Sequence, residues 1–232
     1  MSKIHIEISN LKKSFDHTNG SITLFKNFSI KIKEGELVAL VGPSGSGKSS
    51  LLHLLALLDE PTQGKIILNK IDTKKLTNTE KDEIRRENIS IIFQDNNLLT
   101  DFTAIENIKM PLIIKSENKE IIKKKAEKIL KEVKIYDSSN HFPNELSGGE
   151  QQRVAIARAL ISETNIILAD EPTGNLDYKT SKEIFSLFLK LKKLNKTIIF
   201  ATHNRELANR ADYKLFISDG NIKRVNASKW QK

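Results

Sequence analysis

The chain contains no cysteine. Disulfides and thiolate metal sites are therefore excluded, and the composition fits a reducing compartment. A long apolar run is also missing: the longest one, at 51–58, is interrupted by His53. A membrane-spanning helix needs roughly 20 apolar residues. The first residues, MSKIHIEISN, show no apolar signal core. These absences together predict a cytoplasmic protein with no membrane span of its own.

The composition predicts a folded protein with a sizeable core. Of the 232 residues, 38% are hydrophobic and 29% are charged, which suits one large domain or two small ones. The net charge of +9 permits a nucleic acid or an anionic membrane as partner. Most lysines, however, alternate with glutamates, as in ENKEIIKKKAEKILKEVK at 117–134. Such a pattern favours a solvated helix face, so we expect no nucleic-acid partner.

Apolar segments of strand length alternate with helical segments. Period-two alternation at 3–9 and 28–33 predicts half-buried strands of an antiparallel sheet. The uniformly apolar segment at 37–41 predicts a parallel strand that is buried on both faces. Short buried-strand patterns follow at 89–93, 165–169 and 197–201. Helical patterns follow the first of these strands and occupy 181–194. The alternation predicts an α/β fold with a parallel sheet and an added antiparallel β subdomain.

Residues from about 95 to 160 differ from the rest because they look helical nearly throughout. One helix face there carries Ile121, Ile122, Ile129, Leu130 and Val133. We interpret this stretch as a helical subdomain inserted into a single domain of residues 1–232. The last residues, VNASKWQK, form a tail in which packing of Trp230 on the domain is favoured over contact with a partner.

The segment GPSGSGKSS at 42–50 matches the phosphate-loop pattern G-x-x-x-x-G-K-[ST]. A buried strand precedes it and a helix follows, as the motif requires. Its glycines let backbone N–H groups curl around phosphates, the lysine reaches the β- and γ-phosphates, and the serine after it binds Mg²⁺. The residues predicted to bind ATP here are Gly42, Pro43, Ser44, Gly45, Ser46, Gly47, Lys48, Ser49 and Ser50.

Two adjacent carboxylates end the apolar segment IILADEP at 166–172. Adjacent residues at a strand end point in different directions. Asp170 can thus face the metal while Glu171 faces an attacking water, and phosphoryl transfer needs both functions. His203 follows the strand at 197–201, where it can hydrogen-bond the γ-phosphate. His5, His17, His53 and His141 lack such a setting, and we expect them to be structural or on the surface.

These motifs, in this order, resemble those of an ABC-type ATPase domain, and the resemblance covers essentially the whole chain. LSGGEQQ at 146–152 matches the family signature, here Ser147, Gly148, Gly149 and Glu150. In the family this helix entrance caps the ATP held by the phosphate loop of a second copy. The resemblance therefore implies a P-loop NTPase core in a homodimer with two ATP molecules, and with Mg²⁺, between the chains.

The resemblance assigns three further elements. Gln94 matches the glutamine that senses Mg²⁺, and GNLD at 174–177 matches the dimer-interface loop, with Asn175 and Asp177. Phe15 stands where the family usually has a tyrosine that stacks on adenine, and a phenylalanine keeps that stacking face. Asn204 replaces a frequent aspartate. The implied reaction is ATP hydrolysis, with Glu171 and His203 as the catalytic residues.

A finer resemblance points to the lipoprotein-releasing (LolD-like) subgroup. It rests on LLHLL, LLTDFTAIENIKMPL at 98–112, LADEPTGNLD and ATHN. It implies integral membrane partner subunits and a peripheral position on the cytoplasmic face of the bacterial inner membrane. Leu98, Leu99 and Phe102 are candidate anchors for the partner, with packing inside the helical subdomain as the alternative. Two other functions stay open: a related macrolide-export or cell-division ATPase, and a soluble nucleic-acid-associated ABC ATPase.

Overall fold

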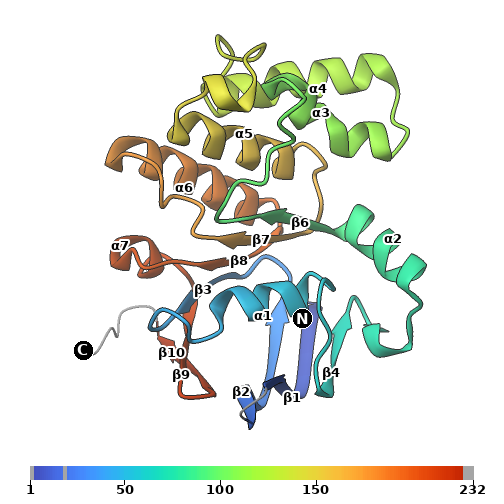
Figure 1. Cartoon of the computed structure of the whole chain (residues 1–232), viewed down its shortest axis with the longest axis vertical. Coiled ribbons are helices and arrows are strands. Elements are labelled where there is room, and N and C mark those ends of the chain that lie inside the picture. Colours follow the sequence, from blue (N-terminus) through green and yellow to red (C-terminus); the bar gives the residue numbers. More distant parts are fainter. Residues whose placement is uncertain (1–2, 18–19, 227–232) are drawn as a thin grey trace.

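The computed structural model describes residues 3–17 and 20–226, so the predicted tail with Trp230 lies outside the described residues. The elements, labelled as in Figure 1, are β1 Ile4–His17, β2 Gly20–Lys33, β3 Leu37–Val41, α1 Lys48–Leu55, β4 Gln63–Leu68, β5 Ile71–Asp72, the 3₁₀ helix η1 Thr73–Lys75, α2 Asn78–Asn88, β6 Ile89–Ile92, α3 Ala104–Ile114, α4 Lys119–Glu132, the 3₁₀ helix η2 Pro143–Glu145, α5 Gly148–Leu160, β7 Ile166–Asp170, α6 Tyr178–Lys193, β8 Thr197–Ala201, α7 Arg205–Ala208, β9 Tyr213–Ser218 and β10 Asn221–Asn226.

A six-stranded sheet in the order β10-β9-β3-β8-β7-β6 forms the centre of the fold. Its strands β6, β7, β8, β3 and β9 pair in parallel, and β10 returns antiparallel to β9. Every residue of β3 and β8 is buried. This burial confirms the prediction for the segments 37–41 and 197–201, because a parallel strand covered on both faces buries the side chains of both. In the other two predicted segments, Ile91 and Phe93 are half-buried and Asn165 is exposed.

The sheet separates two hydrophobic cores. Leu37, Ala39 and Val41 of β3 pack with helices α3 to α7, whereas Val38 and Leu40 pack with α1 and the antiparallel strands. Figure 1 shows α5 and α6 on one side of the sheet and α1 with β1, β2 and β4 on the other. Successive side chains of a strand point to opposite faces, so one short strand contributes to both cores.

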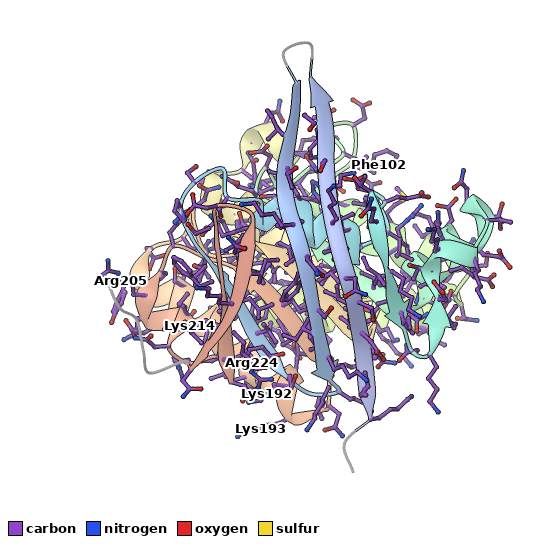
Figure 2. All side chains as sticks on the ribbon, turned by 90° about the horizontal axis from the view of Figure 1, so that it is seen from below. Phe102, Lys192, Lys193, Arg205, Lys214 and Arg224 are labelled. Atoms are coloured by element: carbon purple, nitrogen blue, oxygen red, sulfur yellow. The ribbon has the colours of Figure 1, made fainter. Side chains whose placement is uncertain are left out.

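The antiparallel sheet has the order β2-β1-β4-β5. Its strands β1 and β2 are 14 residues long, and Figure 2 shows the two lying side by side along their length. The segments 3–9 and 28–33 had predicted only part of each strand. The remainder escapes a pattern search because register shifts interrupt the period-two alternation, for example between Ile8 and Leu11.

The stretch 95–160 contains α3, α4 and α5, but the connections 93–103 and 133–147 contain no α-helix. The prediction of a nearly continuous helical stretch is wrong there. It is also wrong for Ile121, which is 41% exposed while Ile122, Ile129, Leu130 and Val133 are buried. A step of one residue turns a helix by about 100°, which carries Ile121 off the buried face. Within the described ranges no helix is long and apolar enough to cross a membrane.

His5 joins the antiparallel sheet to the parallel one. Its Nδ1 lies 2.6 Å from Oγ1 of Thr197, the first residue of β8, and both side chains are buried. Burial lowers the pKa of His5. A neutral buried imidazole therefore contributes stability that is fully present above its ordinary pKa of about 6.5 and is lost as the pH falls toward the lowered value. The structural role predicted for His5 fits this position.

We expect Thr197→Val to lower the free energy of unfolding by about 1–3 kcal/mol, because it leaves the buried His5 ring nitrogen without its partner. Urea denaturation at pH 8 measures this loss. Thr100→Val, at an exposed loop position, is the control and should stay within about 0.5 kcal/mol of the parent. Equal stabilities of the two variants would show that the His5–Thr197 contact contributes nothing.

Candidate functional site

Five segments that are distant in sequence meet around one pocket of about 240 Å³. The phosphate loop, the end of β7, the segment after β6, the segment after β8 and Leu24 of β2 all border it. The lining residues are Leu24, Ser44, Gly45, Gly47, Lys48, Ser49, Ser50, Gln94, Asp170, Glu171 and His203. The structure thus brings together the predicted metal and catalytic residues and most of the predicted phosphate residues, although their positions in the sequence span more than 150 residues. Gly42, Pro43 and Ser46 do not line the pocket.

Parallel strand pairing explains this convergence. β3, β6, β7 and β8 all run in the same direction, so their carboxyl ends lie at one edge of the sheet. Each of these ends leads directly into one bordering segment: the phosphate loop, Gln94, Asp170 with Glu171, or His203. Ligands of open α/β sheets bind at this edge.

The phosphate loop curls around the amine of Lys48. The residue as a whole is 8% exposed. The amine donates hydrogen bonds to the carbonyl oxygens of Gly42 (3.1 Å) and Pro43 (2.9 Å). Gly47 precedes α1 with φ of 101°, and a Cβ on Gly42 would lie 2.1 Å from the Ile217 carbonyl oxygen. Ser46 Oγ is buried and has no hydrogen-bond partner among the described residues. A buried lysine at a helix N-terminus is a site for phosphate.

Glu171 is held in an unusual state. Its backbone is left-handed, with φ of 44°, and its side chain is only 16% exposed. Its Oε2 accepts a 3.4 Å hydrogen bond from the His203 backbone N–H. Its Oε1 is buried, accepts no hydrogen bond from the described residues and lies 3.5 Å from His203 Nε2. Burial raises the pKa of Glu171. Strain, burial and a raised pKa at one carboxylate are typical of a catalytic base.

The oxygen atoms at the pocket suit a hard divalent cation. Ser49, Gln94 and Asp170 border the same space and offer a hydroxyl, an amide and a carboxylate. The described residues contain no cluster of three histidine, cysteine or carboxylate side chains that could hold a metal. Mg²⁺ is usually bound by one or two carboxylates together with phosphates and waters, so this donor set fits that ion when phosphates complete its shell.

Phe15 lies beside the pocket and does not line it. Its ring is 43% exposed on β1, across from Ile22 of β2, and Leu24 of β2 borders the pocket. Lys13, which the sequence analysis missed, places its amine 4.6 Å from the centre of this ring. The amine is fixed by Asp59 at 2.6 Å and by the Glu60 carbonyl at 2.9 Å. A cation against one ring face holds the ring and leaves the opposite face for a planar base.

The signature residues begin α5. Ser147 is its N-cap, and its hydroxyl and backbone N–H both donate to Glu150 Oε2, at 2.7 and 2.9 Å. Ser138 Oγ donates to Glu150 Oε1 at 2.9 Å. These hydrogen bonds, chiefly from Ser147, lower the pKa of Glu150. The Glu150 carboxylate is therefore used in a capping box that shapes the helix entrance, which the sequence analysis did not foresee.

The signature lies next to the GNLD loop, on the surface and outside the phosphate-loop pocket. A Cβ on Gly149 would sit 3.5 Å from the Asn175 carbonyl oxygen, and a Cβ on Gly148 would meet nothing within 4 Å. Asp177 caps α6 by accepting from the backbone N–H groups of Lys179 and Thr180, at 3.0 and 3.1 Å. Ser147, Gly148, Asn175 and Asp177 are all exposed. Both elements are therefore available to another molecule.

The segment after Gln94 is held by two residues that the sequence analysis missed. Arg158 of α5 donates to the carbonyl oxygens of residues 96 and 97, each at 2.7 Å. Buried Asn107 of α3 donates to the Leu99 and Phe102 carbonyls, at 3.0 and 2.9 Å. Leu99 (42%) and Phe102 (38%, labelled in Figure 2) remain exposed, whereas Leu98 packs on the core. Of the three candidate anchors, Leu98 therefore fits the packing alternative.

Comparison with known proteins places the chain in a family. Residues 25–174 match the profile described as ABC transporter. Over 220 residues the chain is 47% identical to the lipoprotein-releasing system ATP-binding protein LolD of Rickettsia bellii (strain RML369-C), covering 93% of this chain and 96% of that relative. It is 40% identical over 223 residues to LolD of Legionella pneumophila (strain Paris), covering 96% of this chain and 98% of that relative.

A solved structure has the same fold. The dimeric structure of a post-hydrolysis state of the ATP-binding cassette MJ0796, bound to ADP and Pi, superposes with a TM-score of 0.92. Its identity is 39%, and the match covers 97% of this chain and 100% of that chain. Fold, pocket and relatives agree: the chain belongs to the ABC transporter family and is one of its ATP-binding, ATP-hydrolysing cassettes.

Proposed function

We propose that this chain is the ATPase subunit of a lipoprotein-releasing transporter, and that it hydrolyses ATP at the 240 Å³ pocket. The observation that carries the ATPase site is the meeting of Lys48, Asp170, Glu171 and His203 around that pocket. The lipoprotein substrate rests on the likeness to the LolD proteins of Rickettsia bellii and Legionella pneumophila, which extends over nearly the full length of both relatives.

Each side chain has a distinct role in this proposal. Lys48 and the first N–H groups of α1 neutralise the phosphates, and Phe15, held by Lys13, stacks on the adenine. Ser49, Gln94 and Asp170 would hold Mg²⁺, which supplies charge neutralisation at the β- and γ-phosphates. Glu171 accepts a proton from the attacking water, and a buried carboxylate with a raised pKa is a better base than an exposed one. His203, beside it, hydrogen-bonds the γ-phosphate.

We expect Glu171→Gln to retain ATP binding and to lose turnover by about 10²–10⁴-fold, because an amide cannot accept the proton. Phosphate release and nucleotide binding measure the two effects separately. The acid limb of the wild-type rate profile should lie above the pH range of an ordinary glutamate, since the raised pKa protonates Glu171 earlier as the pH falls. Undiminished turnover in the variant would remove Glu171 from the catalytic role.

The active unit in this proposal is a homodimer with two shared sites. The signature and the GNLD loop are exposed and contact each other, but they do not line the pocket of their own chain. The N-terminus of α5, opened by Ser147 and two glycines, suits a phosphate from outside. The dimeric state of the similar cassette bound to ADP and Pi supports this assignment.

Mixing two inactive variants tests the shared site. Lys48→Ala and Ser147→Arg chains should each be inactive alone, whereas a mixed dimer has one site with both changes and one with neither. We therefore expect ATPase activity to recover on mixing, toward about a quarter of the parental value when chains pair at random and sites act independently. Asn144→Arg, at an exposed position just before the signature, is the control and should be active without a partner. Silence in confirmed mixed dimers would exclude shared sites.

The partner surface is proposed to be the exposed side of the segment 95–103. Leu99 and Phe102 are exposed there although the segment itself is fixed by Arg158 and Asn107. Apolar side chains on a rigid support are suited to an interface. The partners are integral membrane subunits, and the chain lies peripherally on the cytoplasmic face of the bacterial inner membrane.

Tagged chain recovered from native membranes in mild detergent should bring integral membrane proteins that carry lipoproteins. Leu99→Glu combined with Phe102→Glu should reduce this recovery by at least tenfold while ATP binding and folding persist. Ile71→Glu, at an apolar residue 45% exposed on β5, is the matched control. Recovery of septal division proteins or drug exporters would move the assignment to those functions, and a pool bound to nucleic acid would exclude the transporter.

A further inference from the structure

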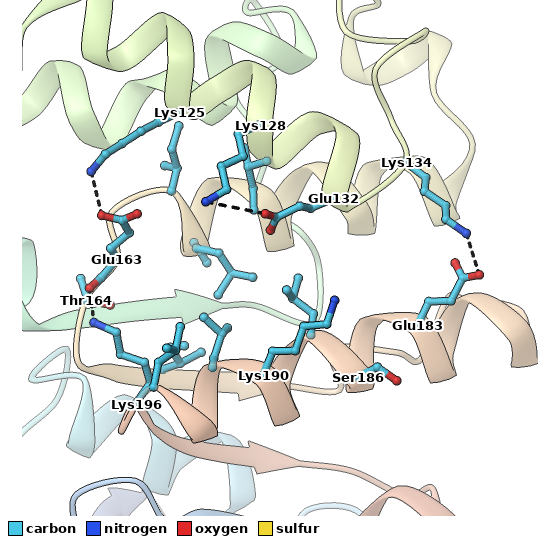
Figure 3. A pocket seen from close by; sticks show the side chains of 18 residues that line it. Lys125, Lys128, Glu132, Lys134, Glu163, Thr164, Glu183, Ser186, Lys190 and Lys196 are labelled. Atoms are coloured by element: carbon cyan, nitrogen blue, oxygen red, sulfur yellow. Dashed lines mark hydrogen bonds and ion pairs between the residues drawn. The ribbon is translucent and has the colours of Figure 1, made fainter.

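A larger cavity, of about 760 Å³, lies between α4, the end of α5, β7 and α6 (Figure 3). It is distinct from the nucleotide pocket. Its lining includes Thr164 and Lys196, which precede β7 and β8, whereas the nucleotide pocket contains residues at and beyond the carboxyl ends of the same strands. The two spaces therefore lie at opposite edges of the parallel sheet. Its volume falls within the range of small-molecule sites, roughly 300–1,000 Å³.

The floor of this cavity is aliphatic. It is formed by isoleucine, leucine and alanine side chains, among them Ile129, Leu160, Leu187 and Leu191. Leu194, at the end of α6, is 69% exposed beside them. None of the described residues that line the cavity is aromatic, so they offer no ring on which a planar base could stack. A floor of this kind favours an alkyl chain, because each buried CH₂ contributes about 0.8 kcal/mol.

The rim of the cavity is basic, with five lysines and three glutamates. Each glutamate is paired: Glu163 with Lys125 at 2.8 Å, Glu183 with Lys134 at 2.7 Å and Glu132 with Lys128 at 4.0 Å. Two lysines remain for a ligand.

The first of these two, Lys196, donates hydrogen bonds to two neutral oxygens, the Glu163 carbonyl at 2.5 Å and Asn165 Oδ1 at 2.9 Å. The Glu163 and Glu34 carboxylates also attract its charge, without an ion pair to either among the residues that the structure describes. Burial lowers its pKa, so a nearby anion would relieve the cost of its charge. The second, Lys190, makes no ion pair with any residue in the described part of the chain, and Figure 3 shows its side chain rising from α6 toward α4. The net charge of the rim is therefore positive, which favours a ligand with an anionic head group.

Two ion pairs bridge the cavity from α4 and the residue that follows it to the elements on the opposite side. Lys125–Glu163 links α4 to the loop before β7, and Lys134–Glu183 links the residue after α4 to α6; Figure 3 shows Lys190 between these pairs. A helix laid along the groove would have to break one of these pairs. A ligand that fits between them needs no such change, so the geometry favours a small amphiphile over a peptide helix.

We propose that this cavity binds a single-chain fatty carboxylate, with its alkyl chain on the aliphatic floor and its carboxylate at Lys190 and Lys196. The site takes a ligand of a class other than nucleotide and lies outside the ATPase machinery. Binding should therefore be unaffected by a non-hydrolysable ATP analogue.

Titration of the full chain with dodecanoate, below its micelle-forming concentration, tests the proposal by calorimetry and by NMR shifts of α6 amides. We expect one site, weakened roughly tenfold by Lys190→Glu because attraction to the carboxylate becomes repulsion. Lys193→Glu is the matched control: Lys193 lies on the same helix, is exposed and does not line the cavity. Its affinity should equal that of the parent.

Probes that change one part of the ligand separate the contribution of the head charge from that of the alkyl chain. Dodecyltrimethylammonium keeps the chain and reverses the head charge, and hexanoate keeps the head and halves the chain; both should bind more weakly than dodecanoate. No dodecanoate binding, or equal binding by the Lys190→Glu and Lys193→Glu variants, would overturn the proposal. An acidic amphipathic helical peptide that binds in a Lys190-dependent manner where dodecanoate does not would assign the cavity to a protein partner and would also overturn it.

Discussion

Parallel pairing of β3 with β8, of β8 with β7 and of β7 with β6 is the constraint on which the functional site depends. It directs the carboxyl ends of four strands to one edge, and each strand is buried on both faces, so none can shift without disrupting a core. A one-residue slip of register would exchange the two faces of a strand. Val41, Asp170 and Ala201 thus have fixed positions. The loops that follow them therefore begin at fixed points at the edge of the sheet.

The site in turn carries a cost that the fold must offset. Glu171 combines a left-handed backbone, a buried oxygen without a hydrogen bond, and a neighbouring carboxylate, Asp170. Burial of an incompletely paired charge destabilises the folded state, and the raised pKa expresses the same cost. Below the ordinary pKa of a glutamate this cost disappears because the group is protonated in both states, and it grows as the pH rises through the raised value. At neutral pH the His203 backbone N–H offsets only part of it.

Local signals in the sequence were sufficient for four of the five parallel strands and for most of the pocket, but not for β9, whose Tyr213, Leu215 and Ile217 are also buried. The segments 37–41 and 197–201 predicted the bounds of β3 and β8. The phosphate loop and the adjacent acids at 170–171 are recognised by residue type and spacing. Contacts between distant segments could not be predicted. Lys13 finds its partner 46 residues away at Asp59, and Arg158 holds carbonyls about 60 residues before it. Helix α2 was also not predicted. It buries none of its residues, so its sequence shows no apolar periodicity.

Helix α5 runs between the two proposed interfaces. Its N-terminus is the exposed signature, and near its C-terminus Arg158 grips the segment that follows Gln94. Its 13 residues span about 20 Å as a rigid rod. Gln94 itself borders the nucleotide pocket, and the segment 95–103 follows it directly, so this segment adjoins the chain's own site at Gln94 and α5 at Arg158. Because Arg158 and Asn107 both donate to backbone carbonyls, the hold on this segment does not depend on the side chains at 96 and 97.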